Sequence, residues 1–282
     1  MYLGYHVSAA GGLFNAFKEA EALDCTAIQI FVGSPQTWAA PNPPEKDIEK
    51  FIALRKASKV EKVLVHAAYL PNPSSPKASL RNISLKKMKD EAKVAYAIGA
   101  DGYNFHCGSN ADGTEQGIAN AINTLNRLAE LTDEKWPVRL ILENDAGAGN
   151  RIGDTIEELA AIWHGLENKK RFGFCLDTCH LFVSGIDVGS KKAVDAMLKE
   201  FDTRIGLEHL YFLHMNDALF GLGSKKDRHA NIGTGEIGLD GFRALLTNPK
   251  LKDKAFILET PRSGDLKKDI ADINTLKKLI KK

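Results

Sequence analysis

Several features that mark other protein classes are missing from this chain of 282 residues. It has only four cysteines, and no two of them form a C-x-x-C pair. So few thiols in a chain of this size are typical of a reduced, intracellular protein rather than of a disulfide framework. No apolar run approaches the roughly 18 residues that a membrane span needs, and the first residues lack the basic and apolar segments of a secretory signal. We therefore expect a cytoplasmic protein without a membrane partner.

The sequence also lacks the short motifs of several common enzyme classes. It contains no Gly-x-Ser-x-Gly elbow and no P-loop, which argues against a hydrolase of the serine type and against a nucleotide-binding loop. The formal net charge is only +2, with 26% charged and 44% hydrophobic residues. This balance is typical of a globular protein, and it neither requires nor excludes a polyanionic partner. No oligomerisation signal is present, so we expect a monomer.

Short apolar segments alternate with helical stretches along the chain. The predicted strands are residues 2–6, 27–32, 62–66, 102–106, 138–143, 171–177, 210–214 and 255–259. The predicted helices are residues 13–23, 45–58, 85–98, 117–131, 155–165, 190–201, 239–247 and 269–280. Apolar strands separated by helices are typical of a parallel sheet, and eight such units predict a closed (β/α)8 TIM barrel of the α/β class. No low-complexity linker divides the chain, so residues 1–282 are expected to form a single domain.

Six predicted strand ends in succession carry a side chain that can bind a metal ion. These are His66, His106, Glu143, Asp177, His214 and Glu259, at intervals of 40, 37, 34, 37 and 45 residues. Three more candidates, His180, Asp227 and His229, follow two of these positions closely. Any one of the nine has an ordinary structural explanation, but the coincidence at six successive strand ends predicts a metal site. In a TIM barrel all nine would lie at one rim, because functional residues occupy the C-terminal ends of the strands.

The types of ligand limit the metal and its chemistry. Imidazoles mixed with carboxylates suit zinc, with Mn²⁺ or Fe²⁺ as substitutes, better than magnesium or calcium. Since zinc takes about four ligands, nine ligands with shared carboxylates fit two or three ions. Such clusters are typical of phosphoryl transfer, where ions hold the attacking and leaving oxygens. Lys225, Lys226 and Arg228 flank Asp227, and they either neutralise phosphates beside the metal or form a solvated charged loop.

Four stretches resemble the endonuclease IV family of apurinic/apyrimidinic (AP) endonucleases. They are residues 6–12 (HVSAAGG), 66–72 (HAAYLPN), 173–180 (GFCLDTCH) and 214–217 (HMND), the last continuing through Gly223 and Ser224 to 227–229 (DRH). The resemblance covers essentially the whole chain in the right order, and the DTCH and DRH segments together are highly specific. It implies three zinc ions at the rim of a TIM barrel. The implied ligand sets are His66, His106 and Glu143; Glu143, Asp177, His214 and Glu259; and His180, Asp227 and His229.

The resemblance also implies the substrate and the reaction. The family hydrolyses double-stranded DNA on the 5′ side of an abasic site, leaving a 3′-hydroxyl and a 5′-deoxyribose phosphate, and it removes blocking groups from 3′ ends. Glu143 is the implied catalytic residue, beside a hydroxide that zinc can generate near neutral pH. Gln36, Tyr69 and Leu70 occupy positions whose side chains enter the gap left by the missing base. An abasic nucleotide costs less to extrude than a paired one.

Several residues depart from the family pattern, and none of them is one of the nine candidate ligands. Gln36 stands where many relatives have arginine, and Leu219 stands where lysine is usual. Ala67 and Ala68 replace more polar residues, and Cys107 stands where a proline often follows the second ligand histidine. These departures concern DNA affinity and substrate preference rather than metal binding.

Two other functions are compatible with parts of the pattern. A divalent-metal sugar isomerase or epimerase on the same barrel would share the set Glu143, Asp177, His214 and Glu259, but it would not need the remaining ligands. A lesion-binding protein that keeps its metals without cutting DNA is supported only by Gln36 and Leu219.

Overall fold

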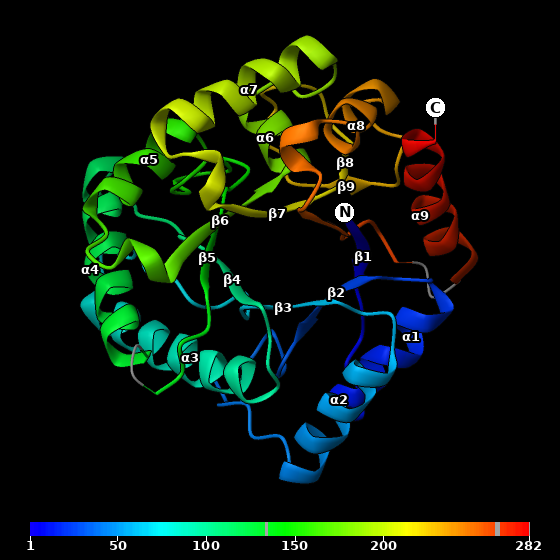
Figure 1. Ribbon diagram of the computed structural model, residues 1–282. Coiled ribbons are helices and arrows are strands. Elements are labelled where there is room, and N and C mark those ends of the chain that lie inside the picture. Colours follow the sequence, from blue (N-terminus) through cyan, green and yellow to red (C-terminus); the bar gives the residue numbers. More distant parts are fainter. Residues whose placement is uncertain (133–134, 263–265, 282) are drawn as a thin grey trace.

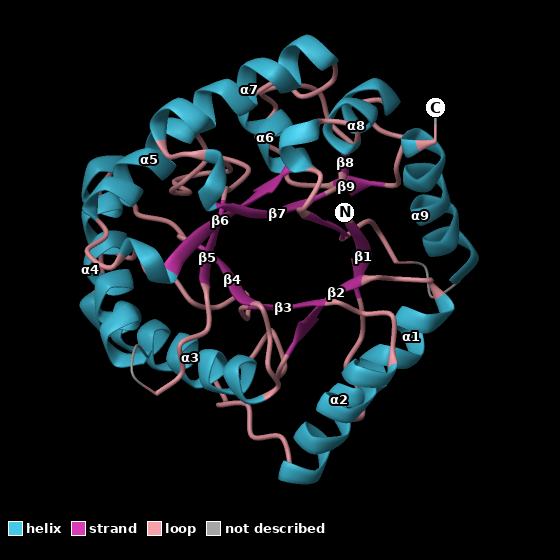
Figure 2. Cartoon of the chain, in the orientation of Figure 1, coloured by secondary structure: helices cyan, strands magenta, loops and turns pink. Residues whose placement is uncertain are grey.

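Eight parallel strands close into a barrel, and helices surround it. The computed structural model describes residues 1–132, 135–262 and 266–281. Within them the strands (magenta in Figure 2) form the inner ring and most helices (cyan) the outer one, with both termini near the same side of the barrel (Figure 1). The barrel strands are β1 (Tyr2–His6), β2 (Ala27–Phe31), β3 (Lys62–His66), β4 (Gly102–His106), β5 (Leu140–Glu143), β6 (Phe172–Asp177), β7 (Leu210–His214) and β10 (Ala255–Leu258). The prediction of a single-domain TIM barrel is confirmed.

Helices follow the strands in the order that the sequence predicts, with one addition. They are α1 (Ala16–Ala22), α2 (Glu45–Ala57), α3 (Ala78–Ala97), α4 (Thr114–Thr132), α5 (Ile156–Gly165), α6 (Thr178–Ser184), α7 (Lys191–Arg204), α8 (Leu239–Leu246) and α9 (Leu266–Ile280). In the part of the chain that the structure describes, the connections also contain the short 3-10 helices η1 (Leu13–Asn15), η2 (Lys169–Arg171), η3 (Leu207–His209) and η4 (Pro249–Leu251). The sequence did not predict α6, nor the short hairpin of β8 (Asp217–Ala218) and β9 (His229–Ala230). The predicted start of α3 was also too late, because residues 78–83 are exposed or half-buried and mix apolar with polar side chains, so no apolar periodicity marks this part of the helix.

The barrel interior is apolar toward the N-terminal ends of the strands, its lower part, and polar toward their C-terminal ends, its upper part. A compact inner cluster fills the lower part and consists of Ala27, Leu64, Ile141, Cys175, Phe212, Ala255 and Ile257. Because side chains alternate along a strand, the next inward residue of each strand lies one layer nearer the C-terminal rim. At this level the inward residues are polar: Gln29 follows Ala27, His66 follows Leu64 and Glu143 follows Ile141. The sequences of these three strands therefore place polar side chains directly above an apolar floor.

The strand register sets the candidate ligands side by side. His106 is paired with Glu143 between β4 and β5, and Asp177 is paired with His214 between β6 and β7. The close approach of β1 to β2 depends on Gly4, since a Cβ there would lie 1.6 Å from the carbonyl oxygen of Ala27. The larger part of the core lies outside the barrel, between the sheet and the helices. None of the helices in the described residues is both long enough and apolar enough to cross a membrane.

Candidate metal centre

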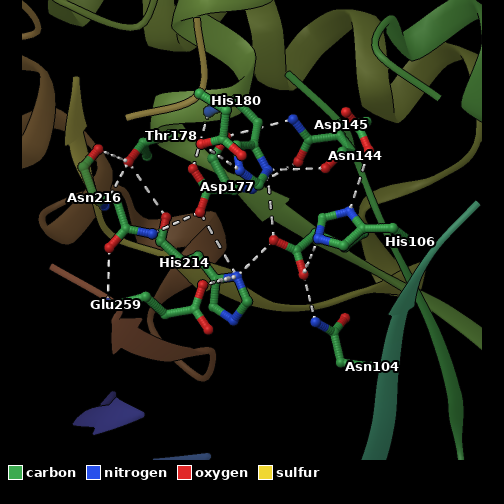
Figure 3. A network of polar contacts seen from close by, with 12 residues as sticks. Asn104, His106, Asn144, Asp145, Asp177, Thr178, His180, His214, Asn216 and Glu259 are labelled. Atoms are coloured by element: carbon green, nitrogen blue, oxygen red, sulfur yellow. Dashed lines mark hydrogen bonds and ion pairs between the residues drawn. The ribbon is translucent and has the colours of Figure 1, made fainter. Parts of the chain in front are cut away.

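The nine predicted ligands lie together at the C-terminal end of the barrel. Several of them face one another in Figure 3. Their nitrogen and oxygen atoms fall into three groups, and within each group these atoms lie within 4.8 Å of one another. The first group is His66, His106 and Glu143; the second group is Glu143, Asp177, His214 and Glu259; the third group is His180, Asp227 and His229. The structure thus brings together every residue that the sequence predicts as a metal ligand, in the sets that the family resemblance implies.

Glu143 lies at the centre because it belongs to two groups. Its Oε1 lies 2.8 Å from Nδ1 of His214, and its Oε2 lies 3.3 Å from Nε2 of His66. The buried side chain of Asn104, one strand away, donates a hydrogen bond of 2.5 Å to Oε2. Glu143 itself is fully buried. A carboxylate held this way has both oxygens directed at different sets of ligands, which suits a position that bridges two cations.

Asp177 joins β6 to α6 and thereby places His180. Its Oδ1 accepts a hydrogen bond of 3.0 Å from the backbone N–H of His180, so it caps the helix that begins at Thr178. Its Oδ2 accepts one of 2.6 Å from Nδ2 of Asn216, and its own N–H donates to Asn144 Oδ1 at 2.7 Å. An aspartate directly before a helix is a strong N-cap signal, and this signal in the DTCH segment could have revealed α6.

The third group depends on the β8–β9 hairpin, which carries Asp227 and His229 over the rim. Asp227 Oδ1 lies 3.4 Å from Nε2 of His180 and 3.5 Å from Nε2 of His229. The two imidazole nitrogens are themselves 3.5 Å apart. Two ring nitrogens and a carboxylate oxygen that converge at this spacing are suited to surround one cation.

Backbone carbonyls fix the tautomers of three of these histidines. Nδ1 of His66 lies 2.8 Å from the oxygen of Ala67, Nδ1 of His180 lies 3.1 Å from that of Asn144, and Nδ1 of His229 lies 3.0 Å from that of Glu259. A carbonyl only accepts, so each Nδ1 must carry the hydrogen. In the neutral rings the lone pair is therefore on Nε2, which faces the other members of its group. This is the usual arrangement around metal-binding histidines.

The ionisable groups shift one another's pKa strongly. Burial alone would raise the pKa of Glu143, but the neighbouring His214 and His106 outweigh it and hold this pKa well below the usual range. Burial lowers the pKa of His214, yet nearby acidic groups, Glu143 and Glu259 among them, raise it well above its ordinary value. The pKa of His180 is likewise raised well above normal, because Asp177 and Asp227 outweigh its burial. Bound cations would replace the imidazole protons, so metal binding should release protons.

A large open cavity lies above the three groups. Its volume is about 1050 Å³, and six of the nine candidate ligands line it. The other three, Glu143, Asp177 and His214, are fully buried beneath it. The cavity thus gives a substrate of considerable size direct access to the candidate metal ligands.

The predicted DNA-contact residues divide into two sets. Tyr69, Lys225, Lys226 and Arg228 line the cavity. Leu70 is half-buried and Gln36 is exposed on the loop after β2, and neither is among the lining residues.

The lining residues that the sequence did not predict include Arg151, Phe220 and Arg262. Arg151 lies 3.4 Å from Asp145, and Lys226 lies above the ring of Phe220, with Nζ 4.7 Å from its centroid. None of the three residues is itself a member of a predicted ligand set or DNA-contact set, so only the tertiary placement reveals them.

Comparisons with known proteins identify the family. A family model described as a xylose isomerase-like TIM barrel matches residues 17–279. A probable endonuclease 4 of Halothermothrix orenii is 39% identical over 279 residues, which cover 99% of this chain and 100% of that protein. This chain belongs to the endonuclease IV family. Endonuclease IV of Thermus thermophilus, a solved member, superposes with a TM-score of 0.88 and 32% identity, covering 100% of this chain and 99% of the other.

The same barrel also occurs outside the endonuclease IV family. A D-tagatose 3-epimerase-like protein of known structure superposes with a TM-score of 0.78 over 100% of this chain and 97% of its own, at 20% identity. At this identity the likeness concerns the fold alone.

Proposed function

We propose that this member of the endonuclease IV family is a zinc-dependent DNA-repair endonuclease that acts on double-stranded DNA containing abasic sites. Water would attack the phosphorus on the 5′ side of the lesion while the bond to the 3′-oxygen breaks, giving a 3′-hydroxyl and a 5′-deoxyribose phosphate. The same hydrolysis would remove blocking groups from 3′ ends. The observation that carries the proposal is the third ligand group, which lies next to the second group under one open, cation-lined cavity.

The residues present fit a cluster of zinc ions. The first, second and third groups are proposed to hold one ion each, with Mn²⁺ or Fe²⁺ as substitutes. Three imidazoles already direct Nε2 at their neighbours because backbone carbonyls hold Nδ1–H. Mixed imidazole and carboxylate ligands are those that zinc prefers. When bound, zinc would act as a Lewis acid and lower the pKa of water to about 7.

The protein side chains would orient the substrate around that chemistry. Glu143 would fix the first and second groups relative to each other, because its two oxygens contact different groups, and it would orient the attacking water. Lys225, Lys226 and Arg228 are exposed at the cavity, where they would bind phosphates without reading the base sequence. Tyr69 is 65% exposed at the same rim, and it would stack in the gap of the abasic strand, while Gln36 and Leu70 would contact the duplex farther from the cavity.

One assay tests the proposed incision and its dependence on metal. A labelled duplex with one abasic site and an intact duplex of the same sequence are incubated with the protein, before and after treatment with a strong chelator. We expect cutting only at the abasic site, loss of cutting with the chelator, and recovery when zinc is returned. Mass analysis of the products checks the 3′-hydroxyl and the 5′-deoxyribose phosphate. Zinc-loaded protein that leaves the abasic strand intact would contradict the proposal.

The two alternatives give different results in the same assay. A sugar isomerase or epimerase would leave both duplexes uncut and would convert ketoses or aldoses instead. A lesion-binding protein would retain the abasic duplex without cutting it. Both leave the third group without a catalytic role, since an isomerase would need only the second group and a binding protein would need no reaction at all.

A further inference from the structure

Gln29 is a buried polar side chain inside the barrel that no metal-binding or DNA-contact prediction includes. It lies on β2 between the inward residues Ala27 and Phe31, and none of its surface is exposed. Its Nε2 donates a hydrogen bond of 2.8 Å to Oε1 of Glu259, while its Oε1 lies 3.2 Å from Nε2 of His214. It therefore contacts two members of the second group, on β7 and at the end of β10.

The orientation of this amide follows from its neighbours. The carboxylate of Glu259 offers only acceptor oxygens to the amide, 2.8 Å away. The amide nitrogen of Gln29 must therefore face Glu259, and the amide oxygen must face His214. An amide oxygen only accepts as well, so Nε2 of His214 must carry a hydrogen. In the neutral ring the lone pair is then on Nδ1.

Nδ1 of His214 is the nitrogen that faces the candidate metal position. It lies 2.8 Å from Oε1 of Glu143, 3.2 Å from Oε2 of Glu259 and 3.7 Å from Oδ2 of Asp177. His214 thus presents the opposite ring nitrogen from His66, which presents Nε2 because a backbone carbonyl holds its Nδ1–H.

The Nε2–H of His214 needs an acceptor from a side chain because of the direction in which Nε2 points. Nε2 faces across the barrel interior toward β2, where the carbonyls of the strands are already paired in the parallel ladders. A buried N–H without an acceptor would be costly. Gln29 supplies that acceptor and, with the other end of the same amide, holds Glu259.

We propose that Gln29 is a positioning residue that fixes the tautomer of His214 and the orientation of Glu259. With Gln29 in place, His214 would contribute its Nδ1 to the ion of the second group. This inference rests on the metal site of the proposed function and adds to it a residue that touches neither metal nor DNA. Partners of this kind typically contribute about 10- to 100-fold to metal affinity. We therefore expect Gln29→Leu to weaken zinc binding at the second group by that factor while the third group keeps its affinity.

The test measures ring nitrogens and zinc affinity rather than catalysis. Long-range ¹H–¹⁵N spectra of the zinc-loaded protein, labelled at histidine, distinguish a zinc-bound nitrogen from an N–H, and the signal of His214 is assigned by its loss in His214→Gln. Zinc dissociation constants come from competition with a chelator of known affinity. The matched control is Gln116→Leu, since Gln116 is an exposed glutamine on α4 far from the barrel interior.

The expected result is zinc on Nδ1 and a hydrogen on Nε2 of His214 in the unaltered protein, with about 10- to 100-fold weaker binding of one zinc ion in Gln29→Leu and none in Gln116→Leu. Zinc on Nε2 of His214 would overturn the inference, and this outcome is visible even if Gln29→Leu does not fold. Unchanged affinity in folded Gln29→Leu would overturn it too. A protein that binds zinc as described and yet leaves abasic DNA uncut would contradict the proposed activity while supporting the role of Gln29.

Discussion

Tyr69 offers the sharpest test of how the rim recognises a lesion. Its ring stands 65% exposed and meets Phe31 edge-on, with centroids 5.3 Å apart and planes at 79°. The backbone beneath the ring is held independently, because the N–H of Tyr69 donates to Pro35 O at 2.9 Å and that of Ala68 donates to Glu91 at 3.3 Å. Replacing the ring in Tyr69→Ala should therefore leave the loop in place.

The structure separates the cost in stability from the cost in binding. About a third of the side chain is buried, and a fully buried aromatic removes about 150–250 Å² from water. At about 25 cal/mol per Å², Tyr69→Ala should lower the free energy of unfolding by at most about 2 kcal/mol, which a typical domain tolerates. Loss of a base-stacking aromatic costs about 1–3 kcal/mol of binding, which corresponds to about 5- to 150-fold weaker affinity. Only a duplex with a gap in its stack should show that loss.

The assay is fluorescence anisotropy with two duplexes, one intact and one carrying an abasic site whose scissile linkage is an uncharged methylphosphonate that resists cutting. Tyr69→Phe should bind the abasic duplex nearly as the unaltered protein does, because it keeps the ring. Tyr96→Ala is the matched control, since Tyr96 is an exposed tyrosine on α3 outside the cavity. If Tyr69→Ala weakens both duplexes equally, the ring does not enter the gap and the reasoning fails.

Three further predictions concern the metal centre and the basic rim. Glu143→Ala and His180→Ala should each abolish incision of abasic DNA while circular dichroism shows an intact barrel, because each removes a member of the candidate ligand groups; incision at the original rate would exclude the mechanism. Chelator-treated protein should lose stability as pH rises above about 6.5. The raised pKa values of His180 and His214 contribute stability below about pH 6.5 that is lost as pH rises through them. The lowered pKa values of Glu143, Glu259 and Asp227 contribute stability that is lost only as pH falls below about 4. Thermal unfolding from pH 4 to 9 should therefore show the chelator-treated protein weakening above about pH 6.5 and the zinc-loaded protein holding its stability; parallel curves would refute the linkage. Lys226→Ala should reduce the slope of log affinity against log salt by about 1, whereas Lys192→Ala, exposed on α7, should leave it unchanged.

The candidate ligands could be predicted from the sequence because each is local to a strand end. A histidine or a carboxylate at the end of an apolar strand shows both which kind of ligand is available and where in the fold it lies. The eight strands of one barrel bring all such strand ends to one rim. His66, Glu143 and Asp177 were found in this way without any tertiary information. The family resemblance then divided the nine residues into sets, and the geometry reproduces those sets.

The residues that support the ligands could not be found in the same way. Asn216 donates to Asp177 from 39 positions away, and Gln29 reaches Glu259 across 230 positions. Nothing in the local sequence distinguishes such an amide from any other inward residue of a strand. Helix α6 escaped prediction for a related reason. Six of its seven residues are buried, so it shows no alternation between an apolar and a polar face, and only the capping aspartate marks its start.

Asp177 explains why the second and third groups form one centre rather than two. Its Oδ1 caps α6 and so sets His180 at the rim, while its Oδ2 lies 3.7 Å from Nδ1 of His214 and 3.8 Å from Nε2 of His229. One carboxylate therefore orients a residue of the third group through the backbone and faces members of both groups directly. A barrel that kept only the second group would have no use for this helix cap or for the hairpin that carries Asp227. Because both additions converge on the oxygens of Asp177, the ion proposed for the third group would lie beside the ion proposed for the second, where metal ions can stabilise the attacking and leaving oxygens of an in-line displacement.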